Sequence, residues 1–443
     1  MKSALYSRLS VMMFLQYAVW GVWLPILARY LQAPTAEGGL GFTAGQVGWI
    51  VGLGGSIGAV TAPFVAGQIA DRYFPAEKFL AVLLLLGGVV KIVTAYQTTF
   101  GAWLLLSVLY SVLFAPTLSL SNSVAFAHLD DPKRQFPTVR VWGTIGWIAA
   151  SWLFPLFWLL RDVELQALPP FYTGVEVENV TGRLVDSMIA SGVVAFGYAA
   201  FCFLLPRTPP KADAVEPLAF SKAFGLMRKR SFAVLVAAAL PISVIHQVYF
   251  MQTAPFFSSL GLGDSQIGPA MTIGQFAEIA VMVATGWLLT RLGFRWVIVI
   301  GAMAYCIRYA IFANEALPVW LIVSSQALHG LCYACFFAAA FIYVDRIATP
   351  DVRHSAQTVF GIIILGVGPV VAAPFLQWIE GAFGQPGGGF ADYSPLWWTT
   401  SAIGLATAIF VAVGFRDETV EGGPAIPVER GDEGEPEVAH GAA

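Results

Sequence analysis

Apolar stretches of roughly 20 residues, the length that crosses a bilayer as a helix, recur along the whole chain. They are separated by shorter polar segments and are too continuous for the alternating strands of a membrane β-barrel. The stretches lie at residues 9–31, 46–69, 79–96, 100–126, 137–160, 189–206, 232–258, 266–290, 296–313, 317–344, 353–378 and 394–415. The pattern predicts an all-α membrane protein with twelve transmembrane helices. We interpret the first stretch as the first span, because it is too long for the apolar core of a signal peptide.

A longer polar segment containing several prolines divides the twelve stretches into two sets of six. We expect it to be a cytoplasmic linker between two six-helix halves. After the last stretch, the chain is rich in Gly, Pro and Glu, a composition typical of disorder. The predicted parts are an N-terminal half at 1–206, the linker at 207–230, a C-terminal half at 231–415 and a disordered tail at 416–443.

The distribution of Lys and Arg predicts the orientation. Cytoplasmic loops of membrane proteins carry an excess of these residues. If the N-terminus is inside, the cytoplasmic loops and both tails hold 18 of the 24 basic residues. We therefore expect an inner-membrane protein with both termini in the cytoplasm, and an external loop at 161–187.

Composition narrows the class further. The chain is 57% hydrophobic and 12% charged, and its net charge of −3 includes no basic stripe that would bind nucleic acid. The four cysteines fall in apolar stretches and are interpreted as small core residues. No sequence pattern indicates a metal or cofactor, and a phosphate-binding Gly-x-x-x-x-Gly-Lys loop, which ATP-driven transport would need, does not occur.

The loop between the second and third stretches carries Gly67-x-x-x-Asp71-Arg72. This motif resembles the signature of the major facilitator superfamily. The resemblance implies that Asp71 and Arg72 form a cytoplasmic latch in the outward-facing state; the alternative is an ordinary charged turn. A fainter copy in the second half has Thr290 where the acid would lie. Repeats of this kind are typical of secondary transporters with a site between the halves.

Four segments resemble the nucleoside:proton symporter family more narrowly: residues 14–23, 136–146, 275–278 and 350–357. The resemblance extends over about residues 8–415 and is most specific in the block Phe136-Pro-Thr-Val-Arg-Val-Trp-Gly-Thr-Ile-Gly146. It implies proton-coupled nucleoside uptake by alternating access, with a nucleoside and protons as the partners in the bilayer.

Glu278 is the one carboxylate deep within a predicted span, and Gln275 lies three residues earlier on the same helical face. A polar side chain at this depth is costly and is therefore a functional candidate. The pair is able to bind adjacent hydroxyls such as those of a ribose, and the resemblance implies the same use. Glu278 is also the candidate for proton coupling. The alternative is a structural ion pair with a basic residue such as Arg308.

Arg140, Thr144 and Trp147 follow one stripe of the fifth span. The first two supply hydrogen bonds, and the indole supplies a flat apolar surface for a heterocycle. The resemblance implies that the positions of Arg140 and Thr144 contact nucleoside. The alternative for Arg140 is a place at the cytoplasmic end of the span, where it only contributes to the positive charge.

Three further candidates come from the resemblance. Gln247 matches a binding glutamine of the family, while His329 and Tyr333 stand where the family has tyrosine and phenylalanine. Phe250 and Ala334 replace a family asparagine and aspartate, so base and sugar preference remain open. For His329 the alternative is a hydrogen-bonded packing residue.

Two other readings of the chain remain. One is a transporter of another polar solute, such as a sugar or a drug-like molecule, with the same fold. The other is a membrane-embedded sensor or enzyme. The lack of a signalling domain argues against a sensor, and the lack of a catalytic motif argues against an enzyme. Lys91 has no assigned role; it lies near the outer end of the third span, where a lysine can extend to the interface.

Overall fold

The computed structural model describes residues 3–65, 73–210, 225–349 and 352–417. The predicted latch residues Asp71 and Arg72 lie outside these residues, as do most of the predicted linker and nearly all of the predicted tail.

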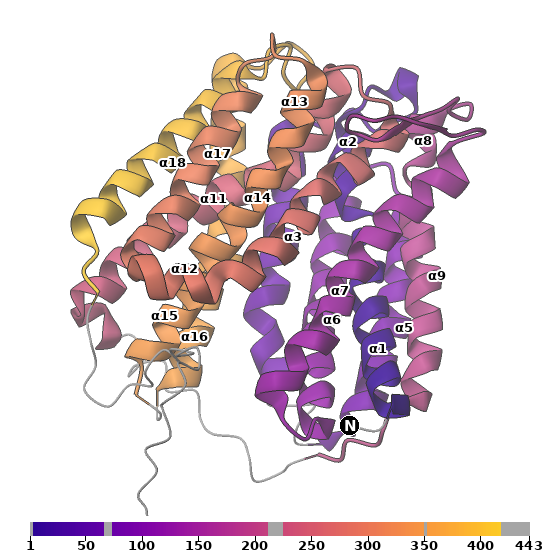
Figure 1. Cartoon of the computed structure of the whole chain (residues 1–443). Coiled ribbons are helices and arrows are strands. Elements are labelled where there is room, and N and C mark those ends of the chain that lie inside the picture. The colour runs from indigo at the N-terminus through magenta and orange to yellow at the C-terminus, as the bar shows by residue number, and fades with distance from the viewer. Residues whose placement is uncertain (1–2, 66–72, 211–224, 350–351, 418–443) are drawn as a thin grey trace, which may run out of the picture.

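The first half of the chain, as far as it is described, consists of helices and one small hairpin (Figure 1). Its elements are α1 (Ser3–Gly21), α2 (Leu24–Gln32), η1 (Thr35–Glu37), α3 (Ala44–Phe64), α5 (Ala76–Ala95), α6 (Phe100–His128), α7 (Pro132–Phe154), η3 (Pro155–Leu159), β1 (Glu164–Leu165), β2 (Tyr172–Thr173), α8 (Val180–Arg183), α9 (Asp186–Phe201) and η4 (Cys202–Leu204). The two strands pair antiparallel, with Glu164 opposite Thr173.

The second half is likewise helical and lies beside the first (Figure 1). Its elements are η5 (Leu226–Arg228), α11 (Arg230–Ser259), α12 (Asp264–Phe312), α13 (Val319–Ser324), η6 (Ser325–Ala327), α14 (Leu328–Leu331), η7 (Cys332–Ala338), α15 (Ala339–Ile347), α16 (Arg353–Ile362), η8 (Ile363–Val367), α17 (Gly368–Phe383) and α18 (Ser394–Gly414). Several short elements are consecutive pieces of one span, because a π-helical turn interrupts the α-helix.

The helices account for the twelve predicted stretches. Ten helices in the described part of the chain are long and apolar enough to cross a membrane. One of them, α12, has 49 residues and contains two predicted spans, which meet at Gly293, where φ is 72° and the backbone is not helical. The remaining stretch corresponds to α3. The predicted all-α membrane fold is therefore confirmed.

The two halves are joined by polar contacts at the end of the molecule that carries β1 and β2, which we call the hairpin end. Arg29 of α2 donates from Nε to the Asp264 carboxylate at the start of α12, 2.8 Å away. The same carboxylate accepts from the Thr181 hydroxyl. Asp264 is 4% exposed, so this ion pair between the halves is largely shielded from solvent.

The hairpin itself also contacts the second half. The Tyr172 hydroxyl donates to the Ser265 carbonyl, and the Glu176 carboxylate accepts from the Ser265 backbone N–H. Gln266 donates to the Tyr172 carbonyl. These bonds hold the hairpin over the N-terminus of α12, so the hairpin end is closed in this conformation.

Close packing between α3 and α17 continues this junction into the membrane. Gly52 lies against the backbone of α17, and a Cβ at this position would be 2.3 Å from the Pro369 carbonyl oxygen. Near the α3 N-terminus, the Glu380 carboxylate accepts from the backbone N–H groups of Ala44 and Gly45, both at 2.8 Å. A carboxylate at that point satisfies donors that a helix start leaves unpaired.

Lys91 lies inside the N-terminal half and does not extend to the interface. It is 5% exposed, and its ammonium lies 3.1 Å from the Trp23 ring centroid and 4.0 Å from that of Tyr110. The Met188 sulfur is 3.7 Å away. The expectation that its stem reaches the membrane surface is wrong, because two ring faces enclose the charge within the helix bundle.

Candidate functional site

Arg140 lies in α7 with its guanidinium turned away from the nearby helix start. Its Cζ is 4.0 Å from the Tyr17 ring centroid on α1. A Cβ at Gly143, one turn further into the membrane, would be 2.8 Å from Arg140 Nη1 and 2.6 Å from Tyr17 Cδ2. The absence of a side chain at Gly143 therefore leaves room for this stack. The geometry disfavours a purely peripheral arginine, which would extend towards the helix start and the interface.

Glu278 faces this stack from the other half of the molecule. It lies in α12 and interacts electrostatically with both Arg140 and Tyr17. Tyr333, in the π-helical segment η7, interacts with the same three residues. The structure thus brings together two residues from each half: Tyr17 and Arg140, Glu278 and Tyr333. Arg140 and Glu278 interact electrostatically, but they are not among the ion pairs that the described residues form.

Tyr333 and Gln275 differ in their surroundings. Tyr333 is 37% exposed although it lies in the middle of a span, and it interacts electrostatically with Arg140 and Tyr17 of the N-terminal half. Gln275 is 9% exposed, and its carbonyl oxygen is buried without a hydrogen-bond donor. An unpaired buried carbonyl is costly unless a ligand or a water supplies the donor.

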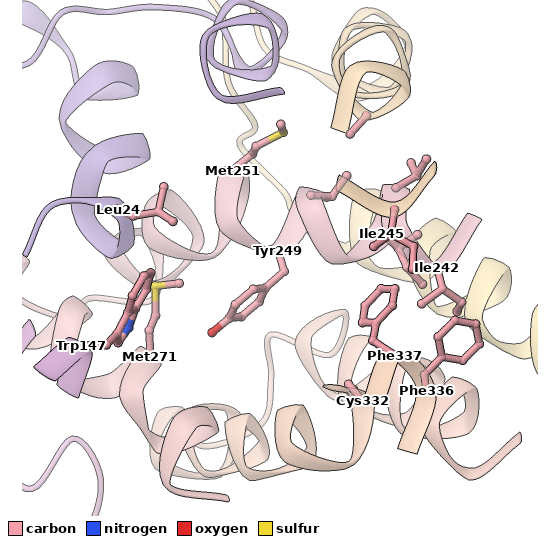
Figure 2. Packing of buried hydrophobic residues seen from close by; sticks show 14 of the residues in the cluster. Leu24, Trp147, Ile242, Ile245, Tyr249, Met251, Met271, Cys332, Phe336 and Phe337 are labelled. Atoms are coloured by element: carbon pink, nitrogen blue, oxygen red, sulfur yellow. The ribbon is translucent and has the colours of Figure 1, made fainter. Parts of the chain in front are cut away.

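Trp147 lies deeper in α7 than Arg140 and Thr144. It is 9% exposed, and its ring packs edge to face against Trp20, with the centroids 5.5 Å apart. Figure 2 shows it at the edge of the buried cluster, with Leu24 and Met271. In this conformation the indole is buried, while Thr144, about one turn nearer to the start of α7, is half-buried.

His329 lies within the C-terminal half rather than on its face. It is 2% exposed, and its Nδ1 is 2.7 Å from Arg308 Nη1. An arginine only donates, so Nδ1 must accept and the ring proton must be on Nε2. While this bond exists, His329 is a neutral imidazole.

Arg308 is fully buried and has aromatic and hydroxyl partners in place of a carboxylate. It donates to the Tyr309 hydroxyl at 2.9 Å, and its Cζ lies 4.5 Å from the Tyr249 ring centroid. The sequence left open a structural ion pair between Arg308 and Glu278. Among the described residues, these two side chains do not pair. Ring faces and neutral hydrogen bonds stabilise this cation instead.

His246, which sequence reasoning did not select, completes the aromatic group in this half. Its ring stacks on His329 with centroids 5.4 Å apart, and its Nδ1 is 2.7 Å from the Tyr305 hydroxyl. Tyr333 lies 6.5 Å from it, centroid to centroid. The neighbouring predicted residue, Gln247, is half-buried on α11. The roles of the eight predicted binding residues stay predictions.

The described residues contain no group of three or more His, Cys, Asp or Glu side chains that could hold a metal ion. The charged and hydrogen-bonding groups that face one another are instead a guanidinium, a carboxylate and phenol rings. Such a set binds a polar organic solute with an aromatic portion.

Comparison with known proteins identifies the family. The family described as Nucleoside H+ symporter matches residues 1–420. This chain belongs to that family. YegT of Escherichia coli (strain K12) is 30% identical over 428 residues, covering 94% of this chain and 95% of the relative. The xanthosine permease of the same organism is 26% identical over 430 residues, covering 92% and 95%.

Solved structures agree on the fold of this nucleoside H+ symporter family member. The crystal structure of the nucleoside transporter NupG superposes with a TM-score of 0.78 at 23% sequence identity, covering 94% of this chain and all of that chain. The chain therefore has the major facilitator fold and is a multi-pass membrane transporter, not an enzyme.

Proposed function

We propose that this transporter imports nucleosides together with protons, using a site between its halves that contains Arg140, Glu278 and Tyr333. The observation that carries the proposal is that a guanidinium and a carboxylate from opposite halves, together with a phenol group, interact electrostatically within the spans. Carboxylate and guanidinium groups bind hydroxyls and ring carbonyls, and an accessible phenol ring stacks on a base. A hexose offers a weaker surface for stacking.

Proton coupling follows from the position of Glu278. A substrate bound between Glu278 and Arg140 alters the interaction of the two charges, so substrate binding and the protonation of the carboxylate are linked. Gln275 contributes an unpaired carbonyl one helical turn away. We assign Thr144, Trp147 and Gln247 to the walls of the same site. His329 supports it from within the C-terminal half through its bond to Arg308.

We infer that the hairpin end faces outward and that both termini are cytoplasmic in the inner membrane. The chain start and the end of α15 lie at the end of the molecule opposite the hairpin (Figure 1), and Asp417, just after α18, pairs with Arg346 of α15. A cysteine introduced at Leu168 in the hairpin loop should react with an impermeant maleimide in intact cells. One introduced at Ala443 should react only after permeabilisation. Asp71 and Arg72 remain the proposed latch on the cytoplasmic side.

The experiment that tests the proposed function is uptake by proteoliposomes. Purified protein should exchange labelled uridine or adenosine by counterflow, and an imposed inward proton gradient should drive accumulation. Glucose is the contrast ligand. Counterflow of glucose and not of nucleosides would refute the substrate class. Nucleoside exchange that an imposed proton gradient does not drive would refute the coupling.

A further inference from the structure

Among the four residues that the two halves bring together at the candidate site, Tyr17 is the one for which the sequence predicted no role. Its ring supports the Arg140 guanidinium at 4.0 Å. Gly143 gives the pair its space, because a Cβ there would overlap with both side chains. The remaining neighbours with which Tyr17 interacts electrostatically include Glu278, in the opposite half.

The stack determines where the arginine charge lies. An arginine has a long, flexible side chain, and in α7 it has two alternatives to its present place. It can extend toward the interface at the helix start, or it can pair directly with Glu278. In either alternative the guanidinium is no longer available to bind substrate. In the second, the Glu278 carboxylate is also occupied and is not available either.

We propose that Tyr17 is a positioning residue for substrate: its ring holds Arg140 turned into the membrane and apart from Glu278, so that both charged groups remain free to bind the solute. This inference rests on the proposed function. The cost of ordering a long side chain is then met within the protein before substrate arrives, which favours tighter binding.

Two substitutions separate the ring from the hydroxyl. Tyr17→Phe keeps the ring face, so nucleoside affinity should stay within about two-fold of the wild type. Tyr17→Leu removes the cation–π contact and should weaken uridine and adenosine binding by about 2- to 30-fold. It should also change the pH dependence of binding, because Arg140 becomes free to pair with Glu278. The measurement is calorimetric titration of purified protein across a range of pH.

The decisive arm is a double-mutant cycle with Arg140→Ala. If Tyr17 acts through Arg140, Tyr17→Leu should have little further effect once the guanidinium is gone. The matched control is Tyr110→Leu, which removes a ring that is also 4.0 Å from a buried cation in the same half, Lys91. This variant should lower thermal stability and leave nucleoside affinity unchanged.

The outcomes distinguish the two proposals. Wild-type protein that binds no nucleoside would refute the proposed function, and this inference with it. Wild-type binding combined with unchanged affinity and pH profile in Tyr17→Leu would refute the inference alone. Additive losses in the double mutant would also overturn it, since they would show that Tyr17 acts independently of Arg140.

Discussion

Replacing Asp264 by Asn should open the hairpin end. In the closed conformation, the carboxylate accepts from Arg29 Nε at 2.8 Å and from the Thr181 hydroxyl. Asn keeps the size of the side chain and one acceptor, but it loses the charge. When the halves separate at this end, Arg29 and Asp264 are on different halves and both become solvated. Asp264→Asn therefore destabilises the closed conformation and leaves the free energy of the open conformation nearly unchanged.

The structure sets the magnitude of this effect. Breaking a buried ion pair costs about 3–5 kcal/mol, but Arg29 is 14% exposed and keeps its second partner, Glu37, at 2.7 Å. The value for a hydrogen bond to a charged group, about 1.5–3 kcal/mol, is the better guide. At 1.4 kcal/mol per factor of ten, the equilibrium should shift about 10- to 150-fold toward the conformation open at the hairpin end.

Distance measurement between spin labels provides the assay. Labels at Leu168 in the hairpin loop and at Ala391 before α18, both exposed positions in different halves, should report a longer distance in Asp264→Asn. The native cysteines are replaced by serine in both proteins compared. An unchanged distance distribution in a folded variant would refute the view that this ion pair holds the end closed.

The control is an ion pair of similar chemistry that does not join the halves. Arg161 and Glu178 are 3.2 Å apart, and their side chains are 57% and 92% exposed. Exposed pairs contribute between zero and about 1 kcal/mol. Glu178→Gln should therefore leave the distance between the labels unchanged. If it opened the hairpin end as far as Asp264→Asn does, a general loss of surface charge would explain both results.

Four further predictions concern the membrane interior. Glu278→Gln should abolish proton-driven nucleoside accumulation in proteoliposomes while leaving some counterflow, and wild-type accumulation would contradict a coupling role. Tyr333→Ala should weaken uridine binding by about ten-fold or more, as loss of one aromatic stack does. Trp147→Ala should weaken uridine binding only if the indole becomes exposed during transport. Calorimetric titration with uridine measures both effects. Lys91→Met should leave nucleoside affinity unchanged, because two rings of its own half enclose the ammonium, and a binding defect would contradict this expectation.

Apolar length alone was enough to predict the helices. A lipid environment permits little other than a helix for stretches of this length, and each predicted stretch is largely helical where the structure describes it. The exception in detail is α12, where two predicted spans form one continuous element and only Gly293 departs from helical geometry. A single polar break in the sequence does not reveal whether the chain turns back through a loop or through one glycine.

Side-chain direction was less predictable, because it depends on partners distant in the sequence. The position of Arg140 near the start of a span suits both an interfacial and an inward orientation, and Tyr17 on another helix decides between them. Lys91 was expected at the interface, but Trp23 and Tyr110 cover it. A polar stripe identifies candidates; the packing of the helices determines which way each one points.

Lys91, Arg140 and Arg308 differ in one respect that bears on mechanism. Rings and neutral donors or acceptors of their own half enclose Lys91 and Arg308. Their surroundings therefore move with them when the halves rotate as rigid bodies. Arg140 has a single ring beneath it and interacts with Glu278 of the opposite half. Of these charges, Arg140 is the one whose electrostatic energy must change as the halves separate, and any substrate or proton that binds between it and Glu278 alters that change. A coupling of solute to proton needs such a dependence, and among these three cations only Arg140 has it.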